Sequence, residues 1–132
     1  MQNYVTDTHA LIWYLTDSPR LSTNATHCFD ACDQGEIKIY LPSISLVELV
    51  YLQERNRIPL LFKQKFDDIL KSHQTNLVIA KLDEMTVEYM KQIPREIVPD
   101  MPDRIIAATA LQLQLPLISC DSKIRKVLNT IW

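Results

Sequence analysis

The chain has 132 residues, 47% of them hydrophobic and 23% charged, and its formal net charge at pH 7 is −2. This composition is typical of a single globular domain, here 1–132, that is large enough to bury a core without metal ions or disulfide bonds. The charge argues against a broad basic face for nucleic acid, so any such contact would be local. The lone glycine, Gly35, excludes the glycine-rich loops that bind nucleotide phosphates.

The sequence pattern gives no sign of a membrane segment or an export signal. No apolar run approaches the roughly 18 residues that span a bilayer. The residues before the first expected strand are too few and uncharged for a signal peptide, so we expect a cytoplasmic protein with no membrane partner. Cys28, Cys32 and Cys120 are expected to be reduced thiols, because a zinc half-site formed with His27 would lack further ligands.

Strand and helix patterns alternate along the chain. Short apolar or alternating runs predict strands at 4–6, 36–41, 77–80, 115–119 and 129–132. Helical periodicity predicts helices directly after Asp7, over 23–33, 43–52, 83–92 and 103–111, and briefly after Asp121, with a helical hairpin over 55–73. This alternation is typical of an α/β fold built on a parallel sheet.

Caps and turns define several of these boundaries. Ser22 is the expected N-cap of the helix over 23–33, and Gly35 is well placed just beyond its C-terminus. Asp83 is expected to cap the helix that follows it, and Pro59 to form the turn of the hairpin. The segment 94–102 contains three prolines and is expected to be a loop.

Four acids occupy comparable positions, and each has a structural explanation of its own. Asp7 and Asp121 precede helices, where an N-cap carboxylate accepts backbone hydrogen bonds. Glu48 completes a capping box with Ser45, in which its side chain would reach back to the Ser45 N–H. Asp103 lies in the first turn of its helix, where the helix dipole favours a negative charge.

Taken together, the four acids point to one site. Asp7 and Asp121 directly follow apolar strands, so a parallel sheet brings both to the same edge, and Glu48 begins a helix just after another strand ends there. The sequence leaves open which edge the Asp103 turn reaches. Two carboxylates about 4 Å apart repel by roughly 4 kcal/mol at an effective dielectric constant of 20, so such a cluster needs a cation. Oxygen ligands favour Mg²⁺ or Mn²⁺ over zinc.

Four segments carry a recognisable pattern in a fixed order. They are VTDTHALIWYL near the start, SISLVEL in the middle, DRIIAATAL, and LISCDSKIR near the end. Each is weak alone, but together they cover almost the whole chain and resemble the PIN-domain ribonucleases, more narrowly the VapC-type toxins of bacterial toxin–antitoxin pairs. The resemblance implies a three-layer α/β/α sandwich with a central parallel sheet of four to five strands.

The resemblance also implies the role of each site residue. The metal-ligating acids of the family match Asp7, Glu48, Asp103 and, through a weaker or water-mediated contact, Asp121. Thr8 and Ser119 match the small hydroxyl residues that accompany the first and the last acid. Arg104 is expected to orient a carboxylate rather than to contact phosphate. The participation of His9, and of Asp100 in the divergent segment VPDMPDR, is left open.

The implied activity is hydrolysis of RNA phosphodiester bonds, with one or two Mg²⁺ or Mn²⁺ ions that orient and acidify a water and neutralise charge on the phosphate. Lys123, Arg125, Lys126 and the basic segment 55–71 are candidate contacts to the RNA backbone, although a solvated charged face explains them equally well. The apolar region 46–62 suits a groove for a partner. The family norm implies an antitoxin and a homodimer.

Two other classes of function stay in view. A PIN-like RNA-binding or scaffold module that has lost its metal would be catalytically silent, which the presence of all four acids disfavours. A phosphatase of the haloacid-dehalogenase type also places an acid after its first strand. It would need a second acid at position 9, where this chain has His9.

Overall fold

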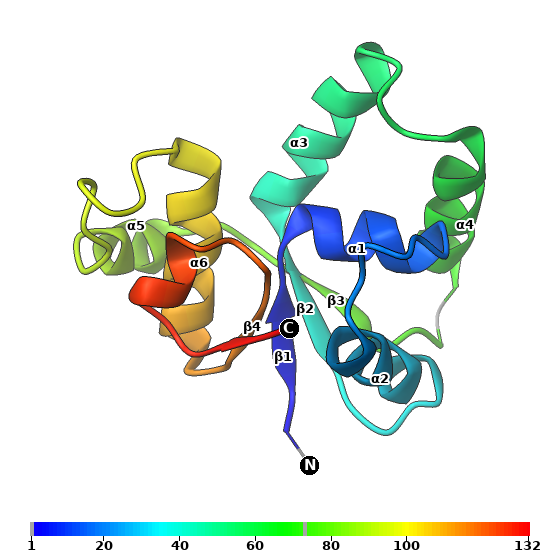
Figure 1. Ribbon diagram of the computed structural model, residues 1–132, viewed down its shortest axis with the longest axis horizontal. Coiled ribbons are helices and arrows are strands. Elements are labelled where there is room, and N and C mark those ends of the chain that lie inside the picture. The colour runs from blue at the N-terminus through cyan, green and yellow to red at the C-terminus, as the bar shows by residue number, and fades with distance from the viewer. Residues whose placement is uncertain (1, 73) are drawn as a thin grey trace.

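The strands form a five-stranded parallel sheet (Figure 1) in a computed structural model that describes residues 2–72 and 74–132. In order across the sheet they are β3 (Leu77–Ala80), β2 (Ile39–Pro42), β1 (Tyr4–Thr6), β4 (Leu117–Ile118) and β5 (Thr130–Ile131). In the central strand β1, Val5 lies opposite Tyr40 of β2 on one side and Leu117 of β4 on the other. The predicted α/β class with a parallel sheet is confirmed.

Helices cover both faces of this sheet. On one side lie α1 (Thr8–Leu15), α2 (Thr23–Asp33) and α4 (Leu60–Lys71), and on the other α5 (Glu84–Met90) and α6 (Met101–Leu113) (Figure 1). α3 (Ser43–Glu54) continues from the end of β2, and a 3₁₀ turn, η1 (Ile124–Lys126), precedes β5. The three layers confirm the expected sandwich. Within the described ranges, no helix is long and apolar enough to cross a membrane.

Two hydrophobic clusters lie on opposite faces of the sheet, because successive side chains of a strand point to opposite sides. Ile39 and Leu41 of β2 are fully buried in the cluster that contains the apolar residues of α1, α2 and α4. Val5 and Leu117 are fully buried in the second cluster, against the alanines of α6. Both clusters support strand ends, and these strand ends carry the polar residues described below.

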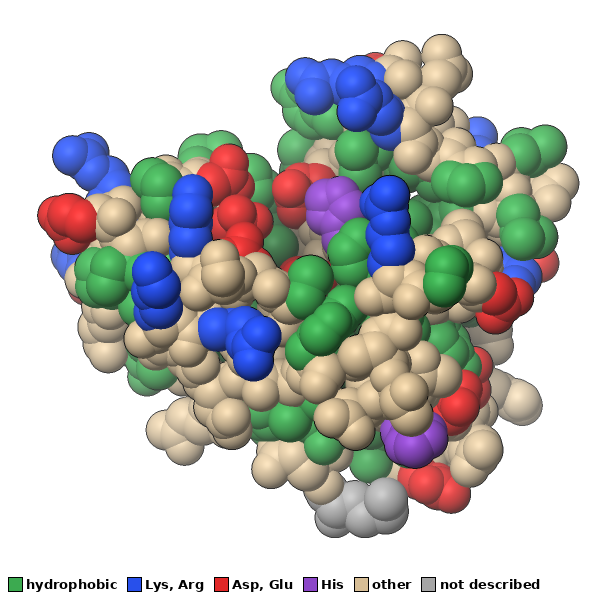
Figure 2. Space-filling model, in the orientation of Figure 1, with side chains coloured by type: hydrophobic (Ala, Val, Ile, Leu, Met, Phe, Trp, Pro, Cys, Tyr) green, Lys and Arg blue, Asp and Glu red, His purple; other side chains and the backbone are tan. Residues whose placement is uncertain are grey.

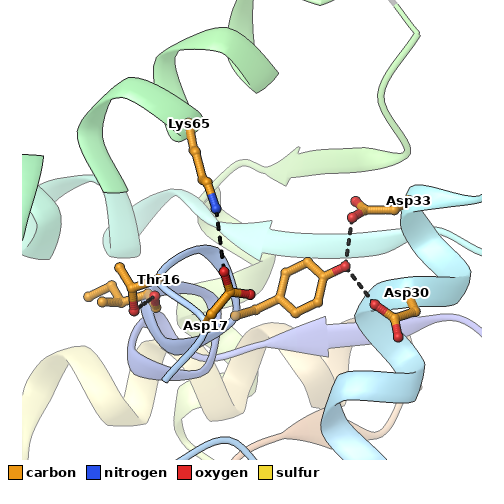
Figure 3. A network of polar contacts seen from close by, with 7 residues as sticks. Thr16, Asp17, Asp30, Asp33 and Lys65 are labelled. Atoms are coloured by element: carbon orange, nitrogen blue, oxygen red, sulfur yellow. Dashed lines mark hydrogen bonds and ion pairs between the residues drawn. The ribbon is translucent and has the colours of Figure 1, made fainter. Parts of the chain in front are cut away.

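Polar contacts tie α1 to α2 and α4 (Figure 3). The Tyr14 hydroxyl lies 2.8 Å from Asp30 Oδ1 and 2.6 Å from Asp33 Oδ2, so its single proton is shared between two acceptors. Burial, followed by these two carboxylates, raises the pKa of Tyr14, which keeps the hydroxyl protonated. Just after α1, Asp17 pairs with Lys65 of α4 at 3.8 Å. The Tyr14 hydrogen bonds hold α1 against α2, whereas the Asp17–Lys65 pair is largely exposed and contributes little.

Several predicted boundaries are confirmed. Ser22 caps α2 by accepting a hydrogen bond from the Ala25 N–H at 3.1 Å, and Gly35 has the positive φ, 78°, expected just beyond the C-terminus of the helix. Asp83 caps α5, and its side chain accepts from the Thr86 N–H at 3.0 Å. The edge strand predicted near the end of the chain is β5.

Other boundaries were predicted wrongly. The segment 55–73 is not a hairpin, because α3 runs to Glu54 and Pro59 precedes the single helix α4; the predicted end at His73 lies outside the described residues. The loop over 94–102 ends two residues early, because Asp100 caps α6 and Pro102 fits its first turn, where no backbone N–H partner is lost. β2 begins at Ile39 rather than at residue 36.

Candidate active site

The four predicted acids meet at the carboxyl end of the sheet. The strand order reverses between β1 and β4, and a pocket of about 240 Å³ opens there. Nine residues line this acid pocket: Asp7, Thr8, His9, Trp13, Glu48, Asp103, Ile106, Cys120 and Asp121. Figure 2 shows acidic side chains in a hollow on this face, with a histidine beside them and Lys and Arg side chains around the rim.

Asp7 lies where β1 turns into α1. Its Oδ1 accepts a hydrogen bond from the Ala10 N–H at 2.8 Å, and its own N–H donates to the Ile118 carbonyl of β4 at 3.2 Å. Burial raises the pKa of Asp7, and the hydrogen bonds from Ala10 and the Ser119 hydroxyl oppose this rise. The N-cap interpretation is confirmed, and the cap hydrogen bond engages only Oδ1.

Glu48 is held in the pocket by Thr8. Thr8 Oγ1 donates a hydrogen bond to Glu48 Oε1 at 2.6 Å and lies 2.8 Å from Ser45 Oγ. Thr8, the hydroxyl residue that follows Asp7, therefore positions Glu48. The capping box predicted for Ser45 and Glu48 is wrong, because α3 already begins at Ser43 with Pro42 as its N-cap, and both side chains are turned toward α1.

Asp103 reaches the pocket from the first turn of α6. The helix runs into β4 and is antiparallel to the strands, so its N-terminus lies at their carboxyl edge, which settles the edge that the sequence left open. Asp100 is the N-cap, and its Oδ2 accepts from the Asp103 N–H at 3.1 Å. Burial raises the pKa of Asp103 to about 7, and the charges of Asp100, Asp121 and Glu48 add to this rise. Asp100 thus acts on the site through Asp103.

Asp121 follows β4 and holds the next turn of the chain. Its Oδ1 accepts from the N–H groups of Lys123 at 2.8 Å and Ile124 at 3.1 Å, which confirms the predicted cap, although the element it caps is the 3₁₀ turn η1. The Asp121 N–H donates to Ser119 Oγ at 3.1 Å. Ser119 is fully buried, so the expected companion hydroxyl supports Asp121 from inside the sheet.

Arg104 makes its hydrogen bonds outside the acid pocket. Its Nε donates to the Ile93 carbonyl at 3.2 Å, and its Nη2 donates to the carbonyls of Ile93 and Met90, both at 2.9 Å. These are carbonyls at and just after the end of α5, where a helix leaves acceptors unsatisfied. The predicted role of Arg104 in orienting a carboxylate is therefore corrected: it ties the start of α6 to the end of α5.

The donor chemistry of the acid pocket fits a hard divalent cation. Its four carboxylates supply oxygen ligands, and the caps engage one oxygen each of Asp7 and Asp121. In residues 2–72 and 74–132 as they stand, no three Asp, Glu, His or Cys side chains are close enough to hold one ion together. Binding of a cation would therefore require the carboxylates of the acid pocket to turn toward its centre. A cation there would offset the burial and repulsion that raise the pKa of Asp103.

Basic side chains lie around the pocket rather than in it. Lys123, Arg125 and Lys126 are exposed on the turn that Asp121 caps, and Arg55 and Arg57 are exposed on the link between α3 and α4. Figure 2 shows Lys and Arg side chains gathered at the rim of the acidic hollow. Their exposure is compatible both with contacts to a polyanion and with simple solvation.

Trp13 is a pocket residue that the sequence prediction missed. It lies four residues after His9 on α1, so the two rings share one helix face, and this spacing is the signal that could have found it. Cys120 also lines the pocket and is an exposed thiol, whereas Cys28 and Cys32 are buried in the core.

Comparison with protein families identifies a PIN domain over residues 4–128, and the chain therefore belongs to the PIN domain family. Its fold is similar to chains in three solved complexes. VapBC2 from Rickettsia felis, bound to a DNA fragment from its promoter, matches with 18% identity, a TM-score of 0.72, and coverage of 98% of this chain and 96% of that chain. DNA-bound VapBC from Salmonella typhimurium matches with 17% identity, a TM-score of 0.69, and coverage of 99% and 98%.

FitAcB from Neisseria gonorrhoeae matches with 19% identity, a TM-score of 0.64, and coverage of 97% and 96%. At these identities the likeness establishes the fold. A comparison with curated protein sequences finds no match. The family resemblance carried by the four sequence segments is thus confirmed, and membership of the PIN family removes the haloacid-dehalogenase alternative.

Proposed function

We propose that this PIN-domain protein is a metal-dependent endoribonuclease that acts as the toxin of a toxin–antitoxin pair, with 1–132 as one domain. The observation that carries the proposal is the convergence of Asp7, Glu48, Asp103 and Asp121 on one pocket, from four different elements. Asp7, Glu48 and Asp103 would hold one or two Mg²⁺ or Mn²⁺ ions, and Asp121 would complete the shell. The bound metal would acidify a water and neutralise charge on the scissile phosphate.

The chain's own residues have distinct tasks in this proposal. Thr8 holds Glu48 by the 2.6 Å hydrogen bond, and Ser119 holds Asp121 because its Oγ accepts a hydrogen bond from the Asp121 backbone N–H. Both hydroxyl residues are buried, so their positions do not depend on solvent. The exposed cations of η1 and of the link after α3 would bind the RNA backbone and offset the negative charge of the pocket.

We further propose a cytoplasmic location, a cognate antitoxin and a homodimer. The partner proposal is supported by the toxin–antitoxin complexes among the similar structures and by a second groove. This groove has a volume of about 560 Å³, lies between α3 and α4, and is lined largely by apolar side chains. Leu60 and Val50, which both line this groove, are 70% and 53% exposed, and contiguous exposed apolar side chains of this kind mark interaction sites. Light scattering of the purified chain would test the dimer.

The test of activity is cleavage of mixed RNA by the purified protein with Mg²⁺ or Mn²⁺, and with EDTA. Asp7→Asn keeps an N-cap side chain but removes a charged ligand, and should lower the rate by more than about 100-fold. Asp17→Asn is a matched control, because Asp17 lies outside the acid pocket at φ 52°, a conformation that asparagine tolerates. Its rate should equal that of the wild type. Equal cleavage by Asp7→Asn would contradict the site, and no cleavage with any metal would favour a silent PIN-like module.

A further inference from the structure

An aromatic row runs along α1 from the acid pocket. The rings of His9 and Trp13 have centroids 5.9 Å apart at an angle of 51°, and the Trp13 and Trp132 rings are 5.7 Å apart in an edge-to-face arrangement. His9 follows Asp7 by two residues, and both His9 and Trp13 line the acid pocket. With a rise of about 1.5 Å per residue, the row extends roughly 6 Å along the helix.

The Trp13 indole is fixed from more than one side. Trp132 packs its ring edge-to-face with it, and the Trp132 carbonyl accepts a hydrogen bond from Asn24 Nδ2 of α2 at 3.1 Å. The Arg20 guanidinium lies 5.9 Å from the centre of the indole. The His9 ring, by contrast, is exposed, and in the described part of the chain it forms no hydrogen bond. A pre-positioned indole beside an exposed imidazole presents aromatic surface to a ligand at the pocket.

We infer that His9 and Trp13 form a stacking surface for one unpaired base of the RNA, next to the phosphate that enters the acid pocket. This inference rests on the proposed function and adds a preference for unpaired RNA. Bases stack on aromatic side chains with little dependence on sequence, because every base has a π face. In a duplex the faces are covered by neighbouring base pairs, so only a loop, a bulge or a single strand offers a free one. Arg20 adds a cation over the face of the same indole.

Intrinsic fluorescence reports on this site, because Trp13 and Trp132 are the only tryptophans of the sequence. Binding is measured by their fluorescence at low salt in EDTA, so that no cleavage is needed. The probes are a twelve-nucleotide oligouridylate and an oligomer of equal length in which every base is missing. The wild type should bind the oligouridylate with quenching of the emission, and should bind the abasic oligomer about tenfold more weakly.

Variants separate stacking from folding. His9→Ala and Trp13→Leu should each lose about tenfold in affinity for the oligouridylate and almost nothing for the abasic oligomer, whereas Trp13→Phe should retain most of the affinity. His27→Ala is the control for His9, because His27 is exposed on α2 and does not line the acid pocket. The Trp13 variants lack one of the two fluorescent indoles, so their binding is measured by the fluorescence anisotropy of a labelled oligomer instead.

Equal affinity of the wild type for the two oligomers, or no binding of either, would overturn the inference. So would a His9→Ala variant that binds the oligouridylate as the wild type does; this exposed position keeps the test valid if Trp13→Leu does not fold. These outcomes differ from failure of the proposed function, in which RNA is bound but no metal supports cleavage.

Discussion

Asp103 is the residue in which burial and charge compete most directly. Its carboxyl group is partly buried at the N-terminus of α6, close to three other acids, and its pKa rises from 3.8 to about 7. The N-terminus of a helix would by itself stabilise the carboxylate. Here burial and the repulsion by Asp100, Asp121 and Glu48 outweigh the helix dipole, which is the condition expected of a site that receives a cation.

This pKa predicts a pH dependence of the metal-free protein. The folded state holds the Asp103 proton up to about pH 7, whereas the unfolded chain releases it near pH 4, so the free energy of unfolding should fall as pH rises between these values. One pKa unit corresponds to about 1.4 kcal/mol, and partial exposure reduces the effect to roughly 1–2 kcal/mol. Asp103→Asn should remove this part of the fall.

The measurement is chemical denaturation of both proteins in EDTA at pH 4.5 and 7.5. The difference between wild type and Asp103→Asn isolates this group from other titrating side chains. Asp17→Asn should follow the wild type at both pH values, because Asp17 is exposed and lies outside the acid pocket. If the free energy of unfolding of Asp103→Asn falls between the two pH values as much as that of the wild type, the raised pKa of Asp103 is wrong.

At the residue scale, sequence reasoning worked where chain order alone fixes position. Asp7 and Asp121 directly follow parallel strands, so their meeting follows from the sheet. The role of Thr8 as the donor that holds Glu48 depends on the packing of α1 against α3, which no local pattern encodes. Arg104 was misjudged for the same reason: its partners are carbonyls at the end of α5, eleven and fourteen residues earlier.

At the element scale, α3 and α4 are the helices that the sequence described least well. The basic residues of 55–73 suggested a separate hairpin, but in the structure α4 packs against α1 and faces α3 across an apolar groove. Local periodicity marks helices but not which earlier element a helix packs against. For α6, the N-cap Asp100 lies within a proline-rich segment that reads as loop, so the helix start was placed two residues late.

The groove between α3 and α4 gives a prediction for the proposed antitoxin. Leu60→Glu places a charge on the apolar edge of the groove, where burying an unpaired carboxylate against a partner is costly. Because Leu60 is 70% exposed, the isolated protein should melt within about 2 °C of the wild type. Its complex with the product of the immediately upstream gene, co-expressed and purified through a tag, should be lost or weakened at least tenfold.

Leu70→Glu is the matched control for this change. Leu70 lies on the same helix and is 48% exposed, but it does not line the groove. Its complex should form normally. An upstream gene product that binds both variants as tightly as the wild type would show that the antitoxin uses another surface.

At the scale of the whole molecule, the position of the site follows from the topology. β1 is central, its next strand in sequence lies on one side and β4 on the other, so the crossovers leave a crevice at its carboxyl end. α1, α3, α6 and the turn after β4 all begin at this edge, and each brings one acid. The fold therefore gathers negative charge that destabilises it in the absence of a cation.

Binding of Mg²⁺ should therefore stabilise the whole protein. A ligand that binds only the folded state at 100 times its Kd adds about 2.7 kcal/mol to the free energy of unfolding, which is several degrees in Tm for a chain of this size. Differential scanning calorimetry at pH 7.5, with MgCl₂ titrated against KCl of equal ionic strength, separates binding from charge screening.

Asp103→Asn should melt higher than the wild type in EDTA, since it removes one repelling charge, and should respond little to Mg²⁺. Asp17→Asn should keep the full response. A Tm that rises equally with KCl and MgCl₂, in all three proteins, would mean that the four acids have only structural roles and hold no metal.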